Sequence, residues 1–263
     1  MKIRLVNDAA AGGSGSRGVP GALNMGIDQT VLEEVSAGKA LPTLRLYHWA
    51  PSCVTLGYFQ SMAEEIDLAA CAGRGIDAVR RITGGGAVFH DAEVTYSLVV
   101  PEGSPLAPDD IMASYGLVCE GLVRGLRGLG IDAVFAPIND IQAGGRKVSG
   151  NAQTRKQGCL LQHGTVLLDL DLETMFSILR VPAEKLKDKL VQDARARVTS
   201  LRGLLGREVG FDEAAAALAA GFAEAWSGLG VELEEGHLTE RELANARRLA
   251  AEKYSTRDWN LKR

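Results

Sequence analysis

The run RRITGGGAVFHDAEVTY, from Arg80 to Tyr96, is the part of this sequence best suited to holding an anion. The residues of Gly84–Gly86 have no Cβ atoms, so a ligand can lie directly on their backbone N–H groups. Arg80 and Arg81 add planar guanidinium donors that suit phosphate or carboxylate. We predict a loop that binds a nucleotide-type phosphate. The alternative is a glycine-rich turn between strands with solvated charges.

A second polar run, PINDIQAGGRKVSGNAQ, lies further along the chain. Asn139 and Asp140 suit a turn or a metal site, and the glycine pair at 144–145 is typical of a hairpin turn. In a regular strand, Lys147 and Ser149 would point to the same face. Lys147 is a compact cation able to bridge a carboxylate and a phosphate. Taken alone, Lys147 would more commonly be a solvated surface lysine, and Asp140 would more commonly be a turn-capping aspartate.

The elements that position these runs follow from apolar periodicity. We predict helices over 22–35, 108–130, 213–229 and 239–254, and strands over 1–7, 76–82, 95–100, 131–135 and 159–171. Strands occur in adjacent pairs without a regular strand–helix–strand rhythm, which favours an α+β fold with a mixed, largely antiparallel sheet and packed helices. Neither G-x-G-x-x-G nor G-x-x-x-x-G-K-[ST] is present, so a nucleotide would be held by another architecture.

Composition excludes several classes of function. The chain has 263 residues and a net charge of −4, without the basic excess expected of a nucleic-acid-binding protein. It has no amphipathic basic helix for a membrane surface and no apolar run of membrane-spanning length. None of the four cysteines forms a C-x-x-C pair, and no secretory signal is evident. We expect a cytoplasmic protein.

The two polar runs, together with NMGIDQ (24–29), LLQHGT (160–165) and EKYSTRDWN (252–260), resemble the biotin/lipoate protein ligase family. The chain looks most like its lipoate–protein ligase A branch and the octanoyltransferases related to it. The resemblance implies a class II biotin/lipoyl synthetase-like catalytic domain spanning residues 1–263. We expect the C-terminal accessory domain of many ligases to be absent, and a separate accessory subunit, which some relatives have, is a possible partner.

The resemblance implies a two-step, ATP-dependent reaction. Lipoate and ATP give lipoyl-AMP, and the acyl group then passes to a lysine of a lipoyl-domain or glycine-cleavage H-type acceptor protein. Lys147 would contact the acyl carbonyl and the α-phosphate, and Asp140 would hold Mg²⁺ with phosphate oxygens. The substrate- and nucleotide-binding residues implied are Arg80, Arg81, Gly84, Gly85, Gly86, Val88, His90, Asn139, Ser149, Gly150, His163, Gly164 and Thr165.

The walls of an acyl pocket are less clearly marked. Val88, Leu46 and Leu56 are candidates, although apolar residues near a motif usually belong to the core. His90 and His163 could suggest a metal, but no third ligand has suitable spacing. We predict that each histidine orders its loop by hydrogen bonding.

Two other functions stay open. An octanoyltransferase would take octanoyl from acyl carrier protein through a cysteine nucleophile, and Glu93 in HDAEVTYS resembles that branch. The places where the branches carry this cysteine, before Lys147 and after the predicted helix over 172–179, contain none here. Cys159 begins an apolar strand and suits a structural role. We therefore favour the ligase. A non-catalytic lipoyl-binding scaffold is the third possibility, and it would tolerate loss of Lys147.

Overall fold

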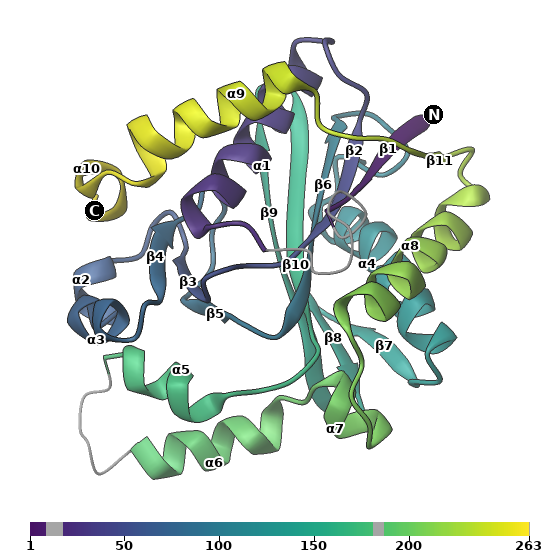
Figure 1. Cartoon of the computed structure of the whole chain (residues 1–263). Coiled ribbons are helices and arrows are strands. Elements are labelled where there is room, and N and C mark those ends of the chain that lie inside the picture. The colour runs from purple at the N-terminus through teal and green to yellow at the C-terminus, as the bar shows by residue number, and fades with distance from the viewer. Residues whose placement is uncertain (9–17, 181–186, 263) are drawn as a thin grey trace.

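The computed structural model describes residues 1–8, 18–180 and 187–262 (Figure 1). Its larger sheet has eight strands in the order β11-β1-β2-β6-β10-β9-β8-β7. The strands of this sheet are β1 (Lys2–Asn7), β2 (Thr43–Tyr47), β6 (Glu93–Pro101), β7 (Ala133–Ala136), β8 (Asp140–Ala143), β9 (Arg146–Lys156), β10 (Cys159–Leu167) and β11 (Glu232–Glu235). Pairing from β2 to β7 is antiparallel, whereas β1 is parallel to both its neighbours.

A smaller sheet carries the glycine-rich run. Its order is β4-β3-β5, formed by β3 (Cys53–Leu56), β4 (Asp77–Arg80) and β5 (Val88–His90). β3 is parallel to β4 and antiparallel to β5. The loop between β4 and β5 therefore starts and ends on the two strands that flank β3.

Helices cover both faces of the larger sheet. The helices are α1 (Gly21–Ser36), α2 (Met62–Glu65), α3 (Leu68–Gly73), α4 (Ile111–Gly128), α5 (Leu172–Ile178), α6 (Lys187–Arg197), α7 (Leu201–Leu205), α8 (Phe211–Ser227), α9 (Glu240–Leu249), the π-helix η2 (Ala250–Tyr254) and α10 (Arg257–Asn260). Figure 1 shows α4 beside α8, and α1 beside α9. Within the described part of the chain, no helix is both long and apolar enough to cross a membrane.

Alternation along the central strands divides the core in two. On β6, Leu98 and Val100 face the cluster under α4 and α8, whereas Val99 between them faces the cluster under α1 and α9. Leu160 and Leu161 on β10 divide in the same way. Because successive strand side chains point to opposite faces, a sheet covered on both sides needs continuous apolar runs such as these.

The predicted α+β class with a mixed, largely antiparallel sheet is confirmed, and the strands form two sheets. The glycine pair at 144–145 makes the predicted hairpin turn, with φ of +56° and +71°. The predicted helix over 108–130 begins later, at Ile111. Its first turn is capped by the Asp110 carboxylate, which accepts a hydrogen bond from the Ala113 amide at 2.9 Å.

A partly buried ion pair joins β1 to the start of α9. Arg4 donates to both carboxylate oxygens of Glu242, at 2.6 and 2.9 Å, and Glu242 also completes a capping box with Thr239. Burial raises the pKa of Glu242, but hydrogen bonds from Arg4 and Thr239 outweigh burial and hold that pKa below its usual value. A lowered folded-state pKa stabilises the fold above the unfolded pKa, and this contribution is lost as pH falls.

We therefore expect Glu242→Gln to lower the free energy of unfolding at pH 7 by about 2 kcal/mol, because it removes the charged hydrogen-bond partner of the partly buried Arg4. The difference from the native chain should shrink below pH about 4. Urea denaturation at a series of pH values measures both effects. Glu252→Gln is the matched control, since Glu252 pairs with Arg248 in an exposed position and should change little.

Candidate functional site

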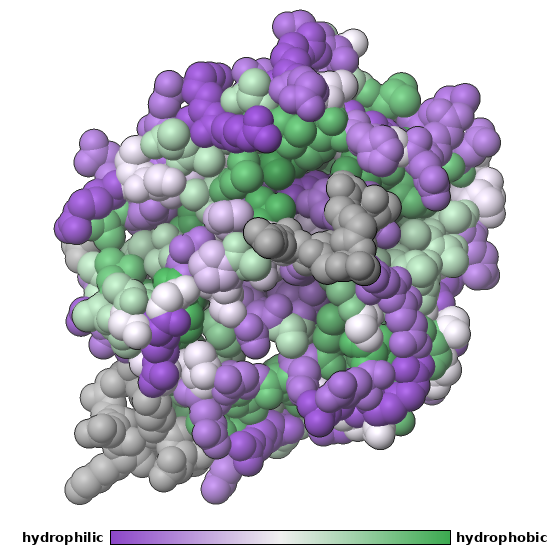
Figure 2. All heavy atoms as spheres, in the orientation of Figure 1, coloured by the Kyte–Doolittle hydropathy of each residue, from purple (hydrophilic) through white to green (hydrophobic). Residues whose placement is uncertain are grey.

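A cavity of about 390 Å³ lies between the two sheets, within the size range of small-molecule sites. The predicted site residues that line it are Arg81, Gly85, Gly86, Val88, His90, Asn139, Lys147, Gly150, His163, Gly164 and Thr165. Arg80, Gly84, Asp140 and Ser149 do not line it. The two polar runs, separated in the chain by residues 97–136, therefore meet around one space. Figure 2 shows hydrophilic residues over much of this side of the molecule, with hydrophobic residues visible beneath α9.

The prediction that Leu46 and Leu56 form walls of the acyl pocket is wrong. Both are fully buried in core clusters and neither lines the cavity. Their strand neighbours Tyr47 and Thr55 line it instead. Because adjacent strand residues point to opposite faces, an error of one position moves a side chain from cavity to core.

Other lining residues had no role assigned from the sequence. They come from α1, from the end of β2 and the residues after it, from β5, and from the segment leading into α5: Met25, Trp49, Phe89, Leu170 and Met175. Met25 belongs to the NMGIDQ motif, which contributed to the family resemblance and was the available signal. The position of α5 beside the cavity depends on tertiary packing, and no pattern in the sequence predicts it.

Arg81 shapes the glycine loop from inside. Its guanidinium donates to the carbonyl oxygens of Gly84, at 2.8 and 3.2 Å, and of Gly86, at 2.9 Å. It also donates to Thr55 Oγ1 at 3.0 Å. All these acceptors are neutral, so the cation has no carboxylate bonded to it within the described residues. Burial lowers the pKa of Arg81 to about 10, which leaves the side chain charged at neutral pH.

The loop is packed too closely for any larger residue at its base. Gly85 has φ of +95°, a conformation that favours glycine. A Cβ on Gly57, which follows β3, would lie 1.8 Å from the Gly85 carbonyl oxygen. The β3 end and the glycine loop are therefore in direct backbone contact.

Arg80 has a different position from the one predicted. It is fully buried, and its guanidinium donates to the carbonyls of Gly57, Tyr58 and Gln60 and of Trp259 and Asn260, at 2.6–3.2 Å. These five bonds occupy the side chain, which lies outside the cavity. Arg80 thus joins the C-terminal segment to the turn after β3. The prediction that it binds nucleotide is corrected in favour of this supporting position.

Lys147 and Asp140 form an ion pair at 2.7 Å, with side chains 38% and 31% exposed. A β-bulge sets the phase of this strand, since Ser149 pairs with Ile141 and Lys147 with Gln142, so Val148 has no partner. The bulge shifts the alternation by one residue. Lys147 lies beside Gly150, where a Cβ would be 2.6 Å from Nζ. The prediction that Lys147 and Ser149 share a face is therefore wrong.

Asn139 fixes the entry to β8. Asn139 and Asn151 hydrogen-bond each other: each side-chain amide donates to the other residue's carbonyl, and the Asn151 backbone amide also donates to the Asn139 carbonyl. The Asn151 side chain also accepts from the Tyr96 hydroxyl at 2.7 Å. The Lys147 carbonyl accepts from the Thr199 amide at 2.8 Å. The backbone on both sides of the ion pair is thereby held.

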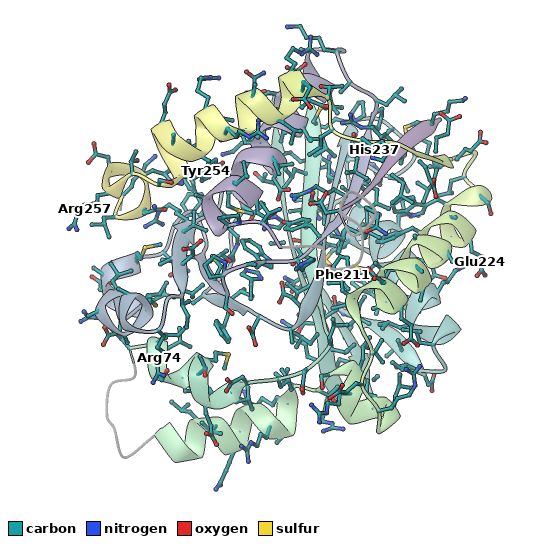
Figure 3. All side chains as sticks on the ribbon, in the orientation of Figure 1. Arg74, Phe211, Glu224, His237, Tyr254 and Arg257 are labelled. Carbon is teal, nitrogen blue, oxygen red and sulfur yellow. The ribbon has the colours of Figure 1, made fainter. Side chains whose placement is uncertain are left out.

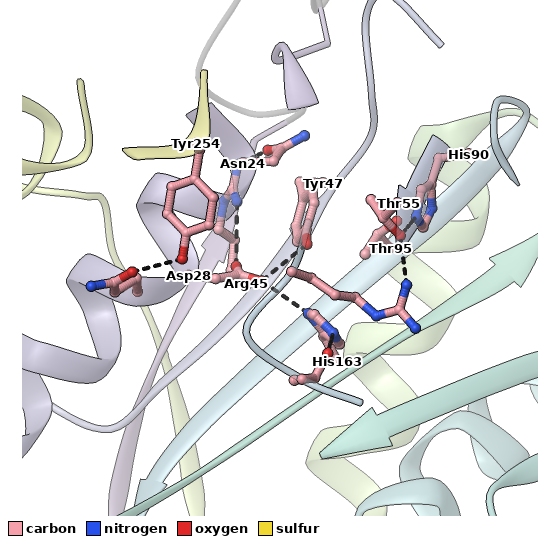
Figure 4. Close-up of polar contacts among 12 residues, drawn as sticks. Asn24, Asp28, Arg45, Tyr47, Thr55, His90, Thr95, His163 and Tyr254 are labelled. Atoms are coloured by element: carbon pink, nitrogen blue, oxygen red, sulfur yellow. Dashed lines mark hydrogen bonds and ion pairs between the residues drawn. The ribbon is translucent and has the colours of Figure 1, made fainter. Parts of the chain in front are cut away.

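His90 belongs to a buried network beside the loop (Figure 4). Its Nε2 is 2.8 Å from Thr55 Oγ1, and its Nδ1 is 2.7 Å from Glu93 Oε1. The Trp49 ring stacks on the imidazole with centroids 4.1 Å apart, and its Nε1 donates to Glu93 at 3.1 Å. Since Thr55 also accepts from Arg81, the network runs from Glu93 to the glycine loop.

His163 belongs to a second network, deeper in the molecule (Figure 4). Its Nδ1 is 3.1 Å from the Asp28 carboxylate and its Nε2 is 2.7 Å from Thr83 Oγ1. Tyr47 donates to Asp28 at 3.3 Å. Burial lowers the pKa of His163 despite Asp28, so the ring is neutral at pH 7. The prediction that His90 and His163 order their surroundings by hydrogen bonding is confirmed.

The cysteines lie outside this cavity. All four are buried and none lines it. Burial raises the pKa of Cys119 to about 12 and also raises the pKa of Cys53, Cys71 and Cys159. Because a thiolate is the reactive form, these thiols are poorly suited to nucleophilic attack.

Comparison with known proteins identifies the family to which this chain belongs. The family model of the lipoyl protein ligase A/B catalytic domain matches residues 20–223. The chain belongs to the lipoyl protein ligase A/B family. Octanoyltransferase LipM of Kyrpidia tusciae is a family relative that is 43% identical to it over 92% of this chain and 95% of that protein.

Solved structures show the same fold for this ligase A/B family member. A bipartite lipoate protein ligase from Thermoplasma acidophilum, studied with its E2 lipoyl domain, matches with a TM-score of 0.84 and 32% identity over 99% of this chain and 96% of that one. A lipoate-protein ligase A bound with ATP matches with a TM-score of 0.78 and 32% identity over 99% of both chains.

Proposed function

We propose that this chain transfers a lipoyl or octanoyl group, activated as the acyl-adenylate, to a lysine of a lipoyl-domain-type acceptor protein. The observation that carries the proposal is the cavity itself. Apolar side chains line much of it, a buried cation and an ammonium group also face it, and every cysteine of the chain lies elsewhere. An activated acyl group can be held there without a covalent thioester to the protein.

Activation joins the acid to ATP. A carboxylate oxygen of the acid attacks the α-phosphorus, the bond to the bridging oxygen breaks, and pyrophosphate leaves. Arg81 and the Gly85 and Gly86 amides would face the carboxylate and phosphate oxygens, because these residues line the cavity and the guanidinium has no bonded carboxylate of its own. Asp140 would hold Mg²⁺ with phosphate oxygens, where the ion supplies neutralisation of phosphate charge. One protein carboxylate is a typical complement for that arrangement.

Transfer then moves the acyl group to nitrogen. The neutral ε-amine of the acceptor lysine attacks the carbonyl carbon, the C–O bond to phosphate breaks, and AMP leaves with that electron pair. The amine nitrogen loses a proton as the amide forms. Lys147 would stabilise the negative charge that develops on the carbonyl oxygen and on the departing phosphate. Its ion pair with Asp140 holds the ammonium at this position before substrate arrives.

A second candidate is octanoyl transfer from octanoyl-acyl carrier protein, without ATP. It is favoured by the name of the LipM relative, which is more similar in sequence to this chain than either solved ligase is. Such transfer through a cysteine would require a thiol in the cavity. The positions and raised pKa values of the four cysteines support the adenylate route instead.

The deciding experiment compares two acyl donors with one acceptor. The purified chain is incubated with an apo lipoyl domain and either lipoate, ATP and Mg²⁺, or octanoyl-acyl carrier protein alone, and mass spectrometry detects the modified lysine. Modification with the first mixture, together with lipoate-dependent exchange between pyrophosphate and ATP, supports the proposal. Modification with the second mixture alone supports the transferase. The Thermoplasma ligase is bipartite, so the first mixture is also tested with an accessory subunit of that type.

We expect Cys159→Ser to keep acyl transfer within about twofold of the native rate, because this buried thiol lies outside the cavity and has a raised pKa. The measurement is the initial rate with each donor. Cys71→Ser, another buried thiol, is the matched control for any loss of stability. Loss of octanoyl transfer in Cys159→Ser alone would instead identify Cys159 as the nucleophile.

A further inference from the structure

Three lysines, one at the end of β9 and two from the C-terminal segment, meet around aromatic rings beside the C-terminal helix. Lys156 and Lys262 lie over the Tyr58 ring, with Nζ 5.0 and 4.8 Å from its centroid. Lys253 lies over the Trp259 ring at 3.8 Å. We call Tyr58, Phe59, Lys156, Lys253, Trp259 and Lys262 the lysine–aromatic patch. In Figure 3 this corner of the molecule is found near the labelled Tyr254 and Arg257.

The cations of the patch are bonded to neutral groups. Lys253 donates to Gln29 Oε1 at 2.8 Å, and Lys262 donates to the Tyr58 hydroxyl at 2.8 Å. Burial, together with the charges of Lys156 and Lys262, lowers the pKa of Lys253 to about 8, although Glu33 acts in the opposite direction. Among the described residues, no carboxylate is hydrogen-bonded to Lys253 or Lys262, so these like charges form a local positive field in a chain whose net charge is −4. Such a field attracts an acidic partner.

Phe59 indicates that the partner is a protein. Its side chain is 83% exposed, the highest value for a large apolar residue in the described part of the chain. It touches Tyr58 edge-to-face, with centroids 5.0 Å apart. A small anion gains nothing from an exposed phenyl ring, whereas a protein surface can bury it as an anchor. Acidic groups around an apolar spot complement both features.

The patch lies directly behind the glycine loop. The Tyr58 amide donates to the Thr83 carbonyl at 2.8 Å, and Arg80 bonds the carbonyls of Tyr58 and Trp259. Gly57, adjacent to Tyr58, is in backbone contact with Gly85, which lines the cavity. A protein seated on the patch is therefore separated from the cavity by the thickness of one loop.

We propose that the lysine–aromatic patch docks the acidic face of the carrier protein that receives the acyl group. The inference rests on the proposed function, because that function requires a folded protein to present its lysine at the cavity. No residue of the patch lines the cavity. Changes there should therefore alter carrier binding and leave acyl activation unchanged.

The test is the double variant Phe59→Ala with Lys262→Glu, measured against an apo lipoyl domain from a 2-oxo acid dehydrogenase as the probe. Binding is titrated calorimetrically at low and high salt, without ATP or lipoate. We expect Kd to rise about tenfold at low salt, with a weaker salt dependence than the native chain. The control pairs Leu41→Ala with Lys39→Glu, which changes an exposed apolar residue and an exposed lysine elsewhere. It should bind like the native chain.

The outcomes separate this inference from the proposed function. Unchanged Kd in the patch variant, or an equal change in the control, overturns the docking site even if the chain acylates the carrier. A patch-dependent Kd in a chain that transfers no acyl group supports the docking site and removes the proposed function. Lys262→Arg should bind normally, because the patch needs the charge at that position.

Discussion

Replacement of Lys147 by alanine is expected to lower acyl transfer by about 100- to 1,000-fold, as for other losses of one principal electrostatic contact to a reacting centre. Lys147 is the ammonium group that lines the cavity, and Asp140 holds it at 2.7 Å. Its side chain is 38% exposed, so its removal should hardly change the free energy of unfolding. The measurement is the rate of carrier acylation, with pyrophosphate exchange followed separately.

Arg146→Ala is the matched control for Lys147→Ala. Arg146 is the adjacent cation on β9 and lies outside the cavity, so its loss should leave the rate within about twofold. A Lys147→Ala rate close to the native rate would remove Lys147 from the reaction. A native chain that binds lipoate but never forms the adenylate or transfers octanoyl would fit a scaffold instead.

Gly57→Ala is expected to be the most damaging change outside the cavity. A Cβ at this position would lie 1.8 Å from the Gly85 carbonyl oxygen, so the glycine loop must move by an ångström or more. Misplacement of a site on that scale costs about 100-fold in rate. Overpacking should also lower the free energy of unfolding by about 1–3 kcal/mol. Both are measured on the purified variant, by carrier acylation and by urea denaturation.

Gly73→Ala provides the comparison, because nothing lies within 4 Å of a Cβ there and its backbone is helical. That variant should keep the native rate and stability. Native activity in Gly57→Ala would show that the glycine loop can shift without consequence, and that its close packing is not a requirement for the reaction. Loss of stability with native activity would separate the packing role from the catalytic one.

Much of the site was predictable because it depends on residue type. Glycines that permit close approach, a charged Arg81 before them, and Lys147 after a hairpin turn have recognisable chemistry in sequence. Long amphipathic helices were predictable for a similar reason. In α4, Val118 and Leu122 repeat at helical spacing, and the structure buries both.

What the sequence concealed depends on geometry between elements. Arg80 and Arg81 are adjacent residues of the same type, yet Arg80 supports the glycine loop from outside and Arg81 bonds the carbonyls within it. The bulge at Val148 changes which residue shares a face with Lys147, and strand alternation alone cannot reveal it. The wall formed by α5 requires knowing where a distant helix packs.

The bonds from Arg80 to Trp259 and Asn260 have a consequence for biosynthesis. A ribosome makes the glycine loop early, but the residues that brace it are about 180 positions later. The loop cannot reach its final support until that last segment has left the exit tunnel. A prematurely terminated product should therefore lack a fully supported glycine loop even where most of the sheet has formed.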